Sequence, residues 1–132
     1  MGTATTEITT EGFKSIVEKD GIVVVDWWAP WCGPCRAFGP IYERVATKNP
    51  DIVFGKVNTE DQPALAGEFG IQSIPTLMIF RDQILVFSQA GMLPEAALDD
   101  LIRQARALDM SKVRKEVQEA EQADASGSGA KA

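Results

Sequence analysis

The sequence predicts an α/β fold with a central mixed, mostly parallel sheet, helices on both faces, and a terminal β-hairpin followed by a helix. Apolar runs typical of buried strands alternate with segments whose apolar residues recur at helical spacing. The run 22–28 is continuous rather than alternating, as expected for a strand covered on both faces. The chain has 132 residues, 45% of them hydrophobic, which is enough for one domain with its own core.

The first residues are polar, and Ile8 is a candidate for the start of a short edge strand. A helix is predicted to open at Thr10 and to end at Gly21. Its apolar stripe consists of Phe13, Ile16 and Val17. The buried strand 22–28 follows directly.

A second helix is predicted over residues 32–48. Its apolar face repeats at helical spacing and consists of Phe38, Ile41, Tyr42 and Val45. Pro40 lies inside this helix, so a kink is expected where the proline ring meets the carbonyl of Arg36. The sequence Asn49-Pro50-Asp51 then breaks the chain.

The second half of the domain repeats the alternation and ends in a hairpin. Pro63 in a first turn and Gly70 at the end bracket a short helix. Two apolar runs separated by the short turn Arg81-Asp82-Gln83 predict an antiparallel hairpin at a sheet edge. The predicted elements are a strand 52–58, the helix 63–70, strands 76–80 and 84–87, and a last core helix that begins at Pro94.

The composition changes after Asp109, so three parts are expected: a domain over 1–108, a charged helical extension over 109–125, and a disordered tail over 126–132. The extension has only a thin apolar line, made of Met110, Val113, Val117 and Ala120. One interpretation is a solvated helix with a loose end, and the other is a helix that docks a partner.

Charge and composition exclude several classes of function. A net charge of −6 argues against a nucleic-acid binder, because phosphates would be repelled. The N-terminal residues do not resemble a signal peptide, and no apolar run reaches the roughly 18–20 residues of a membrane span. We therefore expect a cytoplasmic protein that does not associate with membranes.

The two cysteines lie in the sequence Trp31-Cys32-Gly33-Pro34-Cys35, between the strand 22–28 and the helix 32–48. At the start of a helix the free N–H groups and the dipole stabilise a thiolate, which is the nucleophile of disulfide exchange. A spacing of three residues places both sulfurs on one helix face. The alternative is a metal site, but zinc needs four ligands and the chain has two cysteines and no histidine.

These residues resemble the thioredoxin family. The resemblance rests on the WCGPC sequence, on Asp26 within the preceding apolar strand, and on Ile74-Pro75-Thr76 and Gly91 in the same order, and it covers roughly residues 6–107. It implies a thioredoxin fold and a protein that reduces disulfides by dithiol–disulfide exchange. Cys32, expected at the exposed tip of the helix, would attack the substrate disulfide. Cys35, one turn deeper and less accessible, would then attack Cys32, release the substrate and close the disulfide.

Three more residues are expected to support the cysteines. Asp26 is predicted to be buried with a raised pKa, and to accept a proton from Cys35 directly or through one water; the alternative is an aspartate at a strand end that reaches solvent. Lys56 on the neighbouring strand either approaches Asp26, as the family implies, or is a surface lysine with a buried stem. Trp28 is expected to form a wall under the cysteines.

The resemblance also implies a cis peptide bond before Pro75, whereas general statistics favour trans. With a cis bond, the backbone of Ile74 would be exposed and could pair with a substrate peptide as a strand does. The expected apolar docking surface consists of Trp31, Gly33, Pro34, Ile74, Pro75, Ala90 and Gly91.

The implied partners are disulfide-containing substrate proteins and a thioredoxin reductase, which would supply electrons from NADPH. We expect a monomer with no bound cofactor of its own. Two rival functions remain open: a binding or chaperone module that uses the same apolar surface, and an oxidase or isomerase.

The chain departs from the family pattern at four places. Arg36 stands where lysine is common, and Thr59 stands where an apolar residue is common. The hairpin turn lacks the usual Asn-Gly or Gly-rich sequence, and the tail beyond Asp109 has no counterpart in the minimal family.

Overall fold

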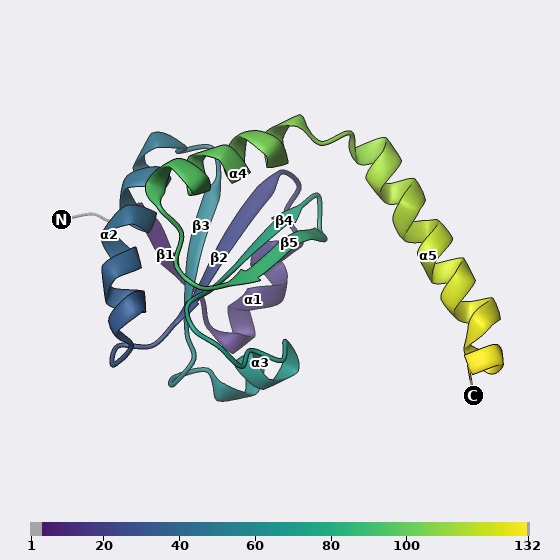
Figure 1. Cartoon of the computed structure of the whole chain (residues 1–132), viewed down its shortest axis with the longest axis horizontal. Coiled ribbons are helices and arrows are strands. Elements are labelled where there is room, and N and C mark those ends of the chain that lie inside the picture. Colours follow the sequence, from purple (N-terminus) through teal and green to yellow (C-terminus); the bar gives the residue numbers. More distant parts are fainter. Residues whose placement is uncertain (1–3, 132) are drawn as a thin grey trace.

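The computed structural model describes residues 4–131 and contains a five-stranded sheet between two layers of helices (Figure 1). The elements in order are β1 (Thr5–Glu7), α1 (Thr10–Val17), β2 (Ile22–Trp28), α2 (Gly33–Lys48), β3 (Val53–Asn58), α3 (Pro63–Glu68), β4 (Thr76–Arg81), β5 (Ile84–Ala90), α4 (Glu95–Ala107) and α5 (Met110–Lys131).

The strand order is β1-β3-β2-β4-β5, which places β2 at the centre of the sheet. Strands β1, β3 and β2 run parallel, and β4 and β5 are each antiparallel to their neighbour. This is the predicted mixed sheet with a terminal hairpin. The edge strand β1 ends one residue before Ile8, whose N–H continues the ladder by donating to the carbonyl of Lys56 over 2.8 Å.

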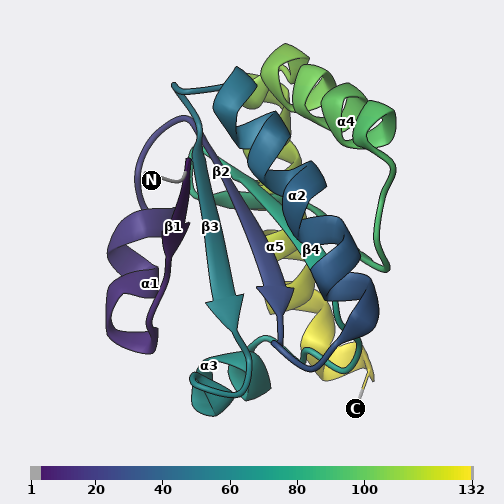
Figure 2. The same ribbon diagram turned by 90° about the vertical axis from the view of Figure 1, so that its left-hand side faces the viewer.

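Both faces of the sheet are buried, as the continuous apolar run of β2 predicts. Val24 packs with α2 and α4, whereas Val23 and Val25 pack with α1 and α3. Figure 2 shows α2 and α4 on one face and α1 on the other. α2 continues as one helix through Pro40. Since alternate residues of a strand point to opposite faces, Asp26 shares the α2 face of the sheet with Val24.

The turn between β4 and β5 consists of Asp82 and Gln83, which have φ values of 50° and 75°. Two consecutive residues at positive φ are typical of the primed hairpin turns, which usually contain Asn or Gly. A distant segment supports the turn: the N–H of Gly21 donates to Asp82 Oδ1 and the N–H of Asp82 donates to the carbonyl of Gly21, both over 2.8 Å. β5 extends to Ala90, three residues beyond the predicted end.

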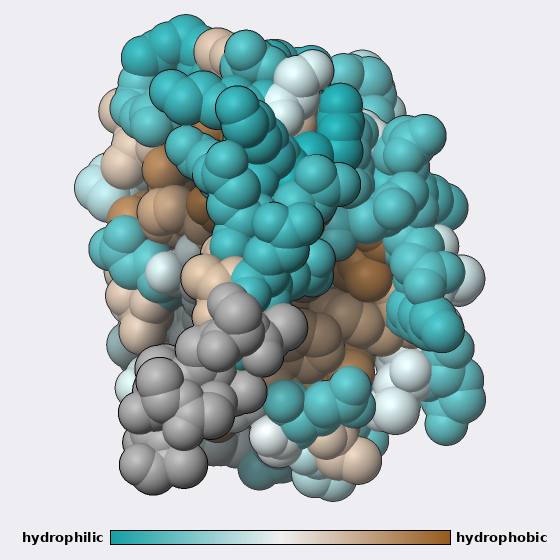
Figure 3. Space-filling view, turned by 90° about the vertical axis from the view of Figure 1, so that its right-hand side faces the viewer, coloured by the Kyte–Doolittle hydropathy of each residue, from teal (hydrophilic) through white to brown (hydrophobic). Residues whose placement is uncertain are grey.

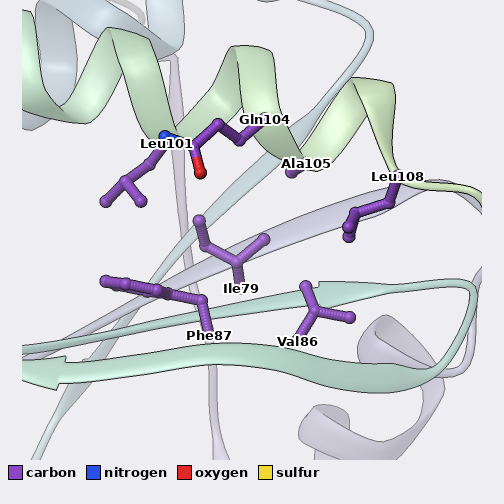
Figure 4. Close-up of a pocket in the computed structure, with 7 residues that line it drawn as sticks. All are labelled: Ile79, Val86, Phe87, Leu101, Gln104, Ala105 and Leu108. Atoms are coloured by element: carbon purple, nitrogen blue, oxygen red, sulfur yellow. The ribbon is translucent and has the colours of Figure 1, made fainter. Parts of the chain in front are cut away.

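A small apolar cavity of about 90 Å³ lies between α4 and the hairpin (Figure 4). Leu101 and Leu108 face Ile79, Val86 and Phe87 across it. None of the residues that line it belongs to the predicted cysteine site.

α5 leaves the end of α4 and extends along one side of the molecule (Figure 1). Met110 is buried, and Arg114 lies 3.7 Å from Asp82 in an ion pair with the hairpin turn. Beyond these contacts an open apolar groove separates α5 from β5. Figure 3 views the molecule from this side and shows apolar side chains among polar ones. The helix runs to Lys131 and so includes residues expected in the disordered tail. None of the helices in residues 4–131 is long and apolar enough to cross a membrane.

Candidate active site

The cysteine pair lies where β2 ends and α2 begins. Cys32 is the N-cap residue of α2, and Gly33 and Pro34 form its first turn, where the missing N–H of proline costs nothing. The two cysteines form a disulfide with their Cα atoms 5.2 Å apart. The structure is therefore that of the oxidised protein.

The sulfur of Cys32 occupies the position of a helix-capping group. It accepts a hydrogen bond from the N–H of Cys35 over 3.2 Å, and it lies 3.7 Å from the carbonyl oxygen of Ile74. A donor at the positive end of a helix favours a negative charge on this sulfur. The arrangement can therefore stabilise a thiolate at Cys32.

The expectation of an exposed Cys32 is wrong for the oxidised form. Cys32 is 5% exposed, hardly more than Cys35 at 3%. Both pack in one cluster with Ala29, against Trp28 and Ile74. Capping directs the Cys32 side chain back over the helix end, so exposure alone does not distinguish the two sulfurs.

Asp26 is buried in the sheet, as the sequence predicts, with 1% exposure. Neither carboxyl oxygen has a hydrogen-bond partner among the described residues. Burial raises the pKa of Asp26 from 3.8 to about 7, and the nearby positive charge of Lys56 offsets part of that rise. A carboxyl group with this pKa can take up and return a proton near neutral pH.

Lys56 is the register partner of Asp26 on β3. Its Nζ lies 4.4 Å from the ring centroid of Trp28, in a cation–π geometry. The ammonium group therefore lies on an aromatic ring, and its charge also acts on Asp26. Trp28 itself packs against the cysteine cluster, as predicted.

The segment around Pro75 forms the opposite wall of the site. The Ile74–Pro75 peptide bond is cis, as the resemblance implies. The carbonyl of Pro75 accepts from the N–H of Gly91 over 2.8 Å, and Thr76 pairs with Ala90 in the hairpin. These bonds bring Ile74 and Gly91 to the same end of the sheet.

Most of the predicted docking residues are accessible. Trp31 is 63% exposed, Ile74 is half-buried and Pro75 is buried. The remaining members, Gly33, Pro34, Ala90 and Gly91, are exposed.

Two further residues were missed by the sequence analysis. Met92, directly after Gly91, is 40% exposed, and the signal available in the sequence was its position beside a predicted docking residue. Glu60 Oε2 accepts a hydrogen bond from Trp31 Nε1 over 2.6 Å. No local sequence pattern indicates that bond, because the partners are 29 residues apart.

Two of the departures from the family pattern have local partners. The guanidinium of Arg36 donates to the carbonyl of Pro30 over 3.2 Å. The N–H and hydroxyl of Thr59 both donate to the carbonyl of Trp28, over 2.8 and 3.1 Å. Thr59 therefore fixes the end of β2, which leads into the cysteine loop.

Within residues 4–131 there is no group of three or more His, Cys, Asp or Glu side chains that could hold a metal ion. The donor set at the site consists of two sulfurs joined in a disulfide. The chemistry available to this arrangement is disulfide exchange.

Comparison with known proteins agrees with this geometry. The family model described as Thioredoxin matches residues 4–104. A protein of Streptomyces coelicolor named "Putative thioredoxin 2" is 61% identical over 117 residues, which are 89% of this chain and 87% of that protein. Thioredoxin 1 of Synechococcus elongatus is 45% identical over 69% of this chain and 87% of its own.

Solved structures give the same result. A thioredoxin of Malassezia sympodialis superimposes with a TM-score of 0.71 at 30% identity, over 80% of this chain and 94% of its own. A mutant thioredoxin of Halobacterium salinarum gives a TM-score of 0.73 at 27% identity, over 82% of this chain and 96% of its own.

Proposed function

This chain belongs to the thioredoxin family, and we propose that its two sulfurs divide the work of disulfide exchange, with Cys32 attacking and Cys35 resolving. The protein is a thiol–disulfide oxidoreductase that reduces disulfides through this cysteine pair. The observation that carries the assignment of roles is the hydrogen bond from the N–H of Cys35 to Cys32 Sγ. Among the described residues, Cys32 is the cysteine whose sulfur caps the helix and accepts a backbone N–H.

In the first step, the Cys32 thiolate of the reduced protein attacks one sulfur of a substrate disulfide. A bond forms between Cys32 and that sulfur, and the substrate S–S bond breaks. The second substrate sulfur leaves as a thiolate and takes a proton from water. The product is a mixed disulfide between protein and substrate.

In the second step, Cys35 attacks Cys32 and the substrate leaves as its second thiolate. The thiol of Cys35 must first lose its proton. Asp26 is the proposed acceptor, directly or through one water, because its pKa of about 7 leaves much of it ionised at neutral pH. Overall, two electrons pass to the substrate and the Cys32–Cys35 disulfide forms.

The substrate is proposed to dock on the accessible residues around the sulfurs. Trp31 provides the largest exposed apolar area, and Ile74 presents a carbonyl 3.7 Å from the attacking sulfur. A substrate chain that pairs with the Ile74 backbone would bring its disulfide close to Cys32. The exposed residues Gly33, Pro34, Ala90 and Gly91 complete the proposed surface, and the buried Pro75 supports the backbone of Ile74 beneath it.

Disulfide-containing proteins are the substrate class of the family. We propose a thioredoxin reductase as the second partner, which would return electrons from NADPH to the oxidised pair, with no cofactor bound to this chain. A monomer in the cytoplasm fits these roles, since a reducing compartment keeps thiols available for exchange.

Reduction of insulin by the dithiol form tests the exchange activity. We expect the wild type to reduce insulin and the double variant Cys32→Ser with Cys35→Ser to lack all activity. If the double variant still binds client proteins, the result would instead support the rival function, a binding or chaperone module that uses the same apolar surface. A reduction potential near that of thioredoxin, about −270 mV, separates a reductase from an oxidase, which lies near −120 mV.

Alkylation of the reduced protein tests the assignment of roles. Cys32 should react with iodoacetamide faster than Cys35 at pH 6.5, because its sulfur caps the N-terminus of α2 and accepts the N–H of Cys35, which favours the reactive thiolate. Equal rates for the two cysteines, or a Cys32 that is inert at pH 7, would contradict the proposal.

A further inference from the structure

We propose that Glu60 is a specificity-determining residue that biases exchange toward disulfides flanked by basic residues. The inference rests on the docking surface proposed above and adds to it the charge preference of the substrate.

Glu60 lies at the edge of the largest exposed apolar side chain of that surface. Its Oε2 accepts a hydrogen bond of 2.6 Å from the indole N–H of Trp31, the residue that precedes Cys32. Trp31 is 63% exposed, so a peptide laid across its ring comes close to this carboxylate. The other carboxylate oxygen of Glu60, Oε1, makes no hydrogen bond within the described part of the chain and can accept one from a ligand.

The backbone that carries Glu60 is fixed by buried groups. The side chain of Asn58, 9% exposed, accepts from the N–H of Glu60 over 2.9 Å. Thr59, which lies between Asn58 and Glu60, donates two hydrogen bonds to the carbonyl of Trp28. The carboxylate is therefore held beside the cysteine loop by both β2 and β3.

A carboxylate in this place attracts a cation on the substrate and repels an anion. The cationic residue that follows Cys35, Arg36, donates a hydrogen bond to the carbonyl of Pro30. Ion pairs at exposed sites contribute little each, and the expected preference is about twofold to fivefold. Such a preference acts on the docking of the substrate and leaves the sulfur chemistry as described above.

The test uses three peptides, each a homodimer joined by one disulfide. They are identical except for the residues on both sides of the cysteine, which are lysine, glutamine or glutamate. The reduced full-length protein is mixed with each peptide at pH 7 and low salt, and the second-order rate constant for cleavage is measured by chromatography. Flanking charges also change the intrinsic reactivity of a disulfide, so the informative quantity is how the lysine-to-glutamate rate ratio changes between protein variants.

We expect Glu60→Gln to lower this ratio by about twofold to fivefold. Glu119→Gln removes the same charge from an exposed position on α5 and should change the ratio by less than about 1.3-fold. In 0.5 M salt the difference between wild type and Glu60→Gln should shrink, because exposed charges are screened.

The inference is overturned if Glu60→Gln keeps the wild-type ratio, or if Glu119→Gln lowers the ratio as much. In either case cleavage of the glutamine peptide by the wild type shows that exchange itself operates. If the wild type leaves the glutamine peptide intact, the proposed function fails as well.

Discussion

Asp26 and Lys56 are paired in register on β2 and β3, yet they form no ion pair among the described residues. The ammonium group of Lys56 lies over the ring of Trp28 instead. The carboxyl group is buried, and in the described part of the chain it has no hydrogen-bond partner. Its raised pKa follows from that isolation.

Replacing Asp26 by alanine should stabilise the protein at neutral and alkaline pH. The folded pKa of Asp26 is raised from 3.8 to about 7, so the native state holds a proton that the unfolded state has lost. The contribution of Asp26 to stability is therefore fully present below about pH 3.8 and is lost as the pH rises through about 7. The difference in pKa corresponds to about 4 kcal/mol, and we expect Asp26→Ala to be about 2–4 kcal/mol more stable at pH 8.

Urea denaturation at pH 4 and pH 8 checks this expectation. The advantage of Asp26→Ala should shrink at pH 4, where the wild-type carboxyl group is largely protonated. Turnover of insulin by the variant should be slower. A variant no more stable than the wild type at pH 8 would contradict the assigned burial cost.

Replacing Lys56 by methionine should raise the pKa of Asp26 further. The positive charge of Lys56 lowers this pKa, and methionine keeps an apolar stem on Trp28 while removing the charge. The carboxyl carbon of Asp26, followed by NMR through a pH titration, gives the midpoint directly. An unchanged or lower midpoint would show that Lys56 does not act on Asp26.

Replacing Gly55 by alanine should destabilise the fold by about 2–3 kcal/mol. A Cβ at Gly55 would lie 2.8 Å from Ile8 Cγ1 and would overlap the end of that side chain. Ile8 is buried under α1, so it has little room to move. Thermal unfolding measures the loss.

Two further variants control this prediction. Gly67→Ala in α3 meets open space and should be neutral or slightly stabilising. Combining Gly55→Ala with Ile8→Ala should cost less than the sum of the two single changes. Strict additivity would mean that the two positions do not collide.

Replacing Arg81 by alanine should destabilise the protein by about 2–3 kcal/mol. Its guanidinium Nη1 donates to the carbonyls of Ala105, Arg106 and Leu108, over 2.7, 3.1 and 2.9 Å. These carbonyls end α4 and have no partner further along that helix. Guanidinium chloride denaturation measures the change.

Arg103→Ala is the matched control for Arg81. Arg103 is exposed and pairs only with Asp100 on its own helix, so its loss should cost less than about 0.5 kcal/mol. Equal effects of the two variants would contradict the capping role of Arg81.

Truncation after Leu108 tests the proposed boundary between domain and extension. It removes the buried side chain of Met110 and the ion pair of Arg114 with Asp82, a loss of about 1–2 kcal/mol. We expect insulin reduction to stay within about twofold of the wild type, because no residue of α5 belongs to the proposed site. A tenfold loss of activity in a folded truncated protein would make α5 part of the functional unit.

The sequence alone was sufficient for the order of the strands and helices and for the cysteine pair, but not for every boundary: β1 ends before Ile8, α1 ends at Val17 and β5 runs to Ala90. These features depend on residues that are close in the chain. The continuous apolar run of β2 indicates a strand that is buried on both faces. The CGPC spacing places both sulfurs in one helical turn. The burial of Asp26 follows from the same run. The cis bond before Pro75 was predictable only through the family resemblance.

Tertiary structure alone decided which groups meet around these elements. Three contacts join residues that are between 28 and 61 positions apart. They are the hydrogen bond of Trp31 to Glu60, the cation–π contact of Lys56 with Trp28, and the hydrogen bonds between Asp82 and Gly21. Periodicity fixes the face on which a side chain lies but not the atom that it contacts. That choice depends on how sheet and loops pack, for which a single sequence carries no local signal.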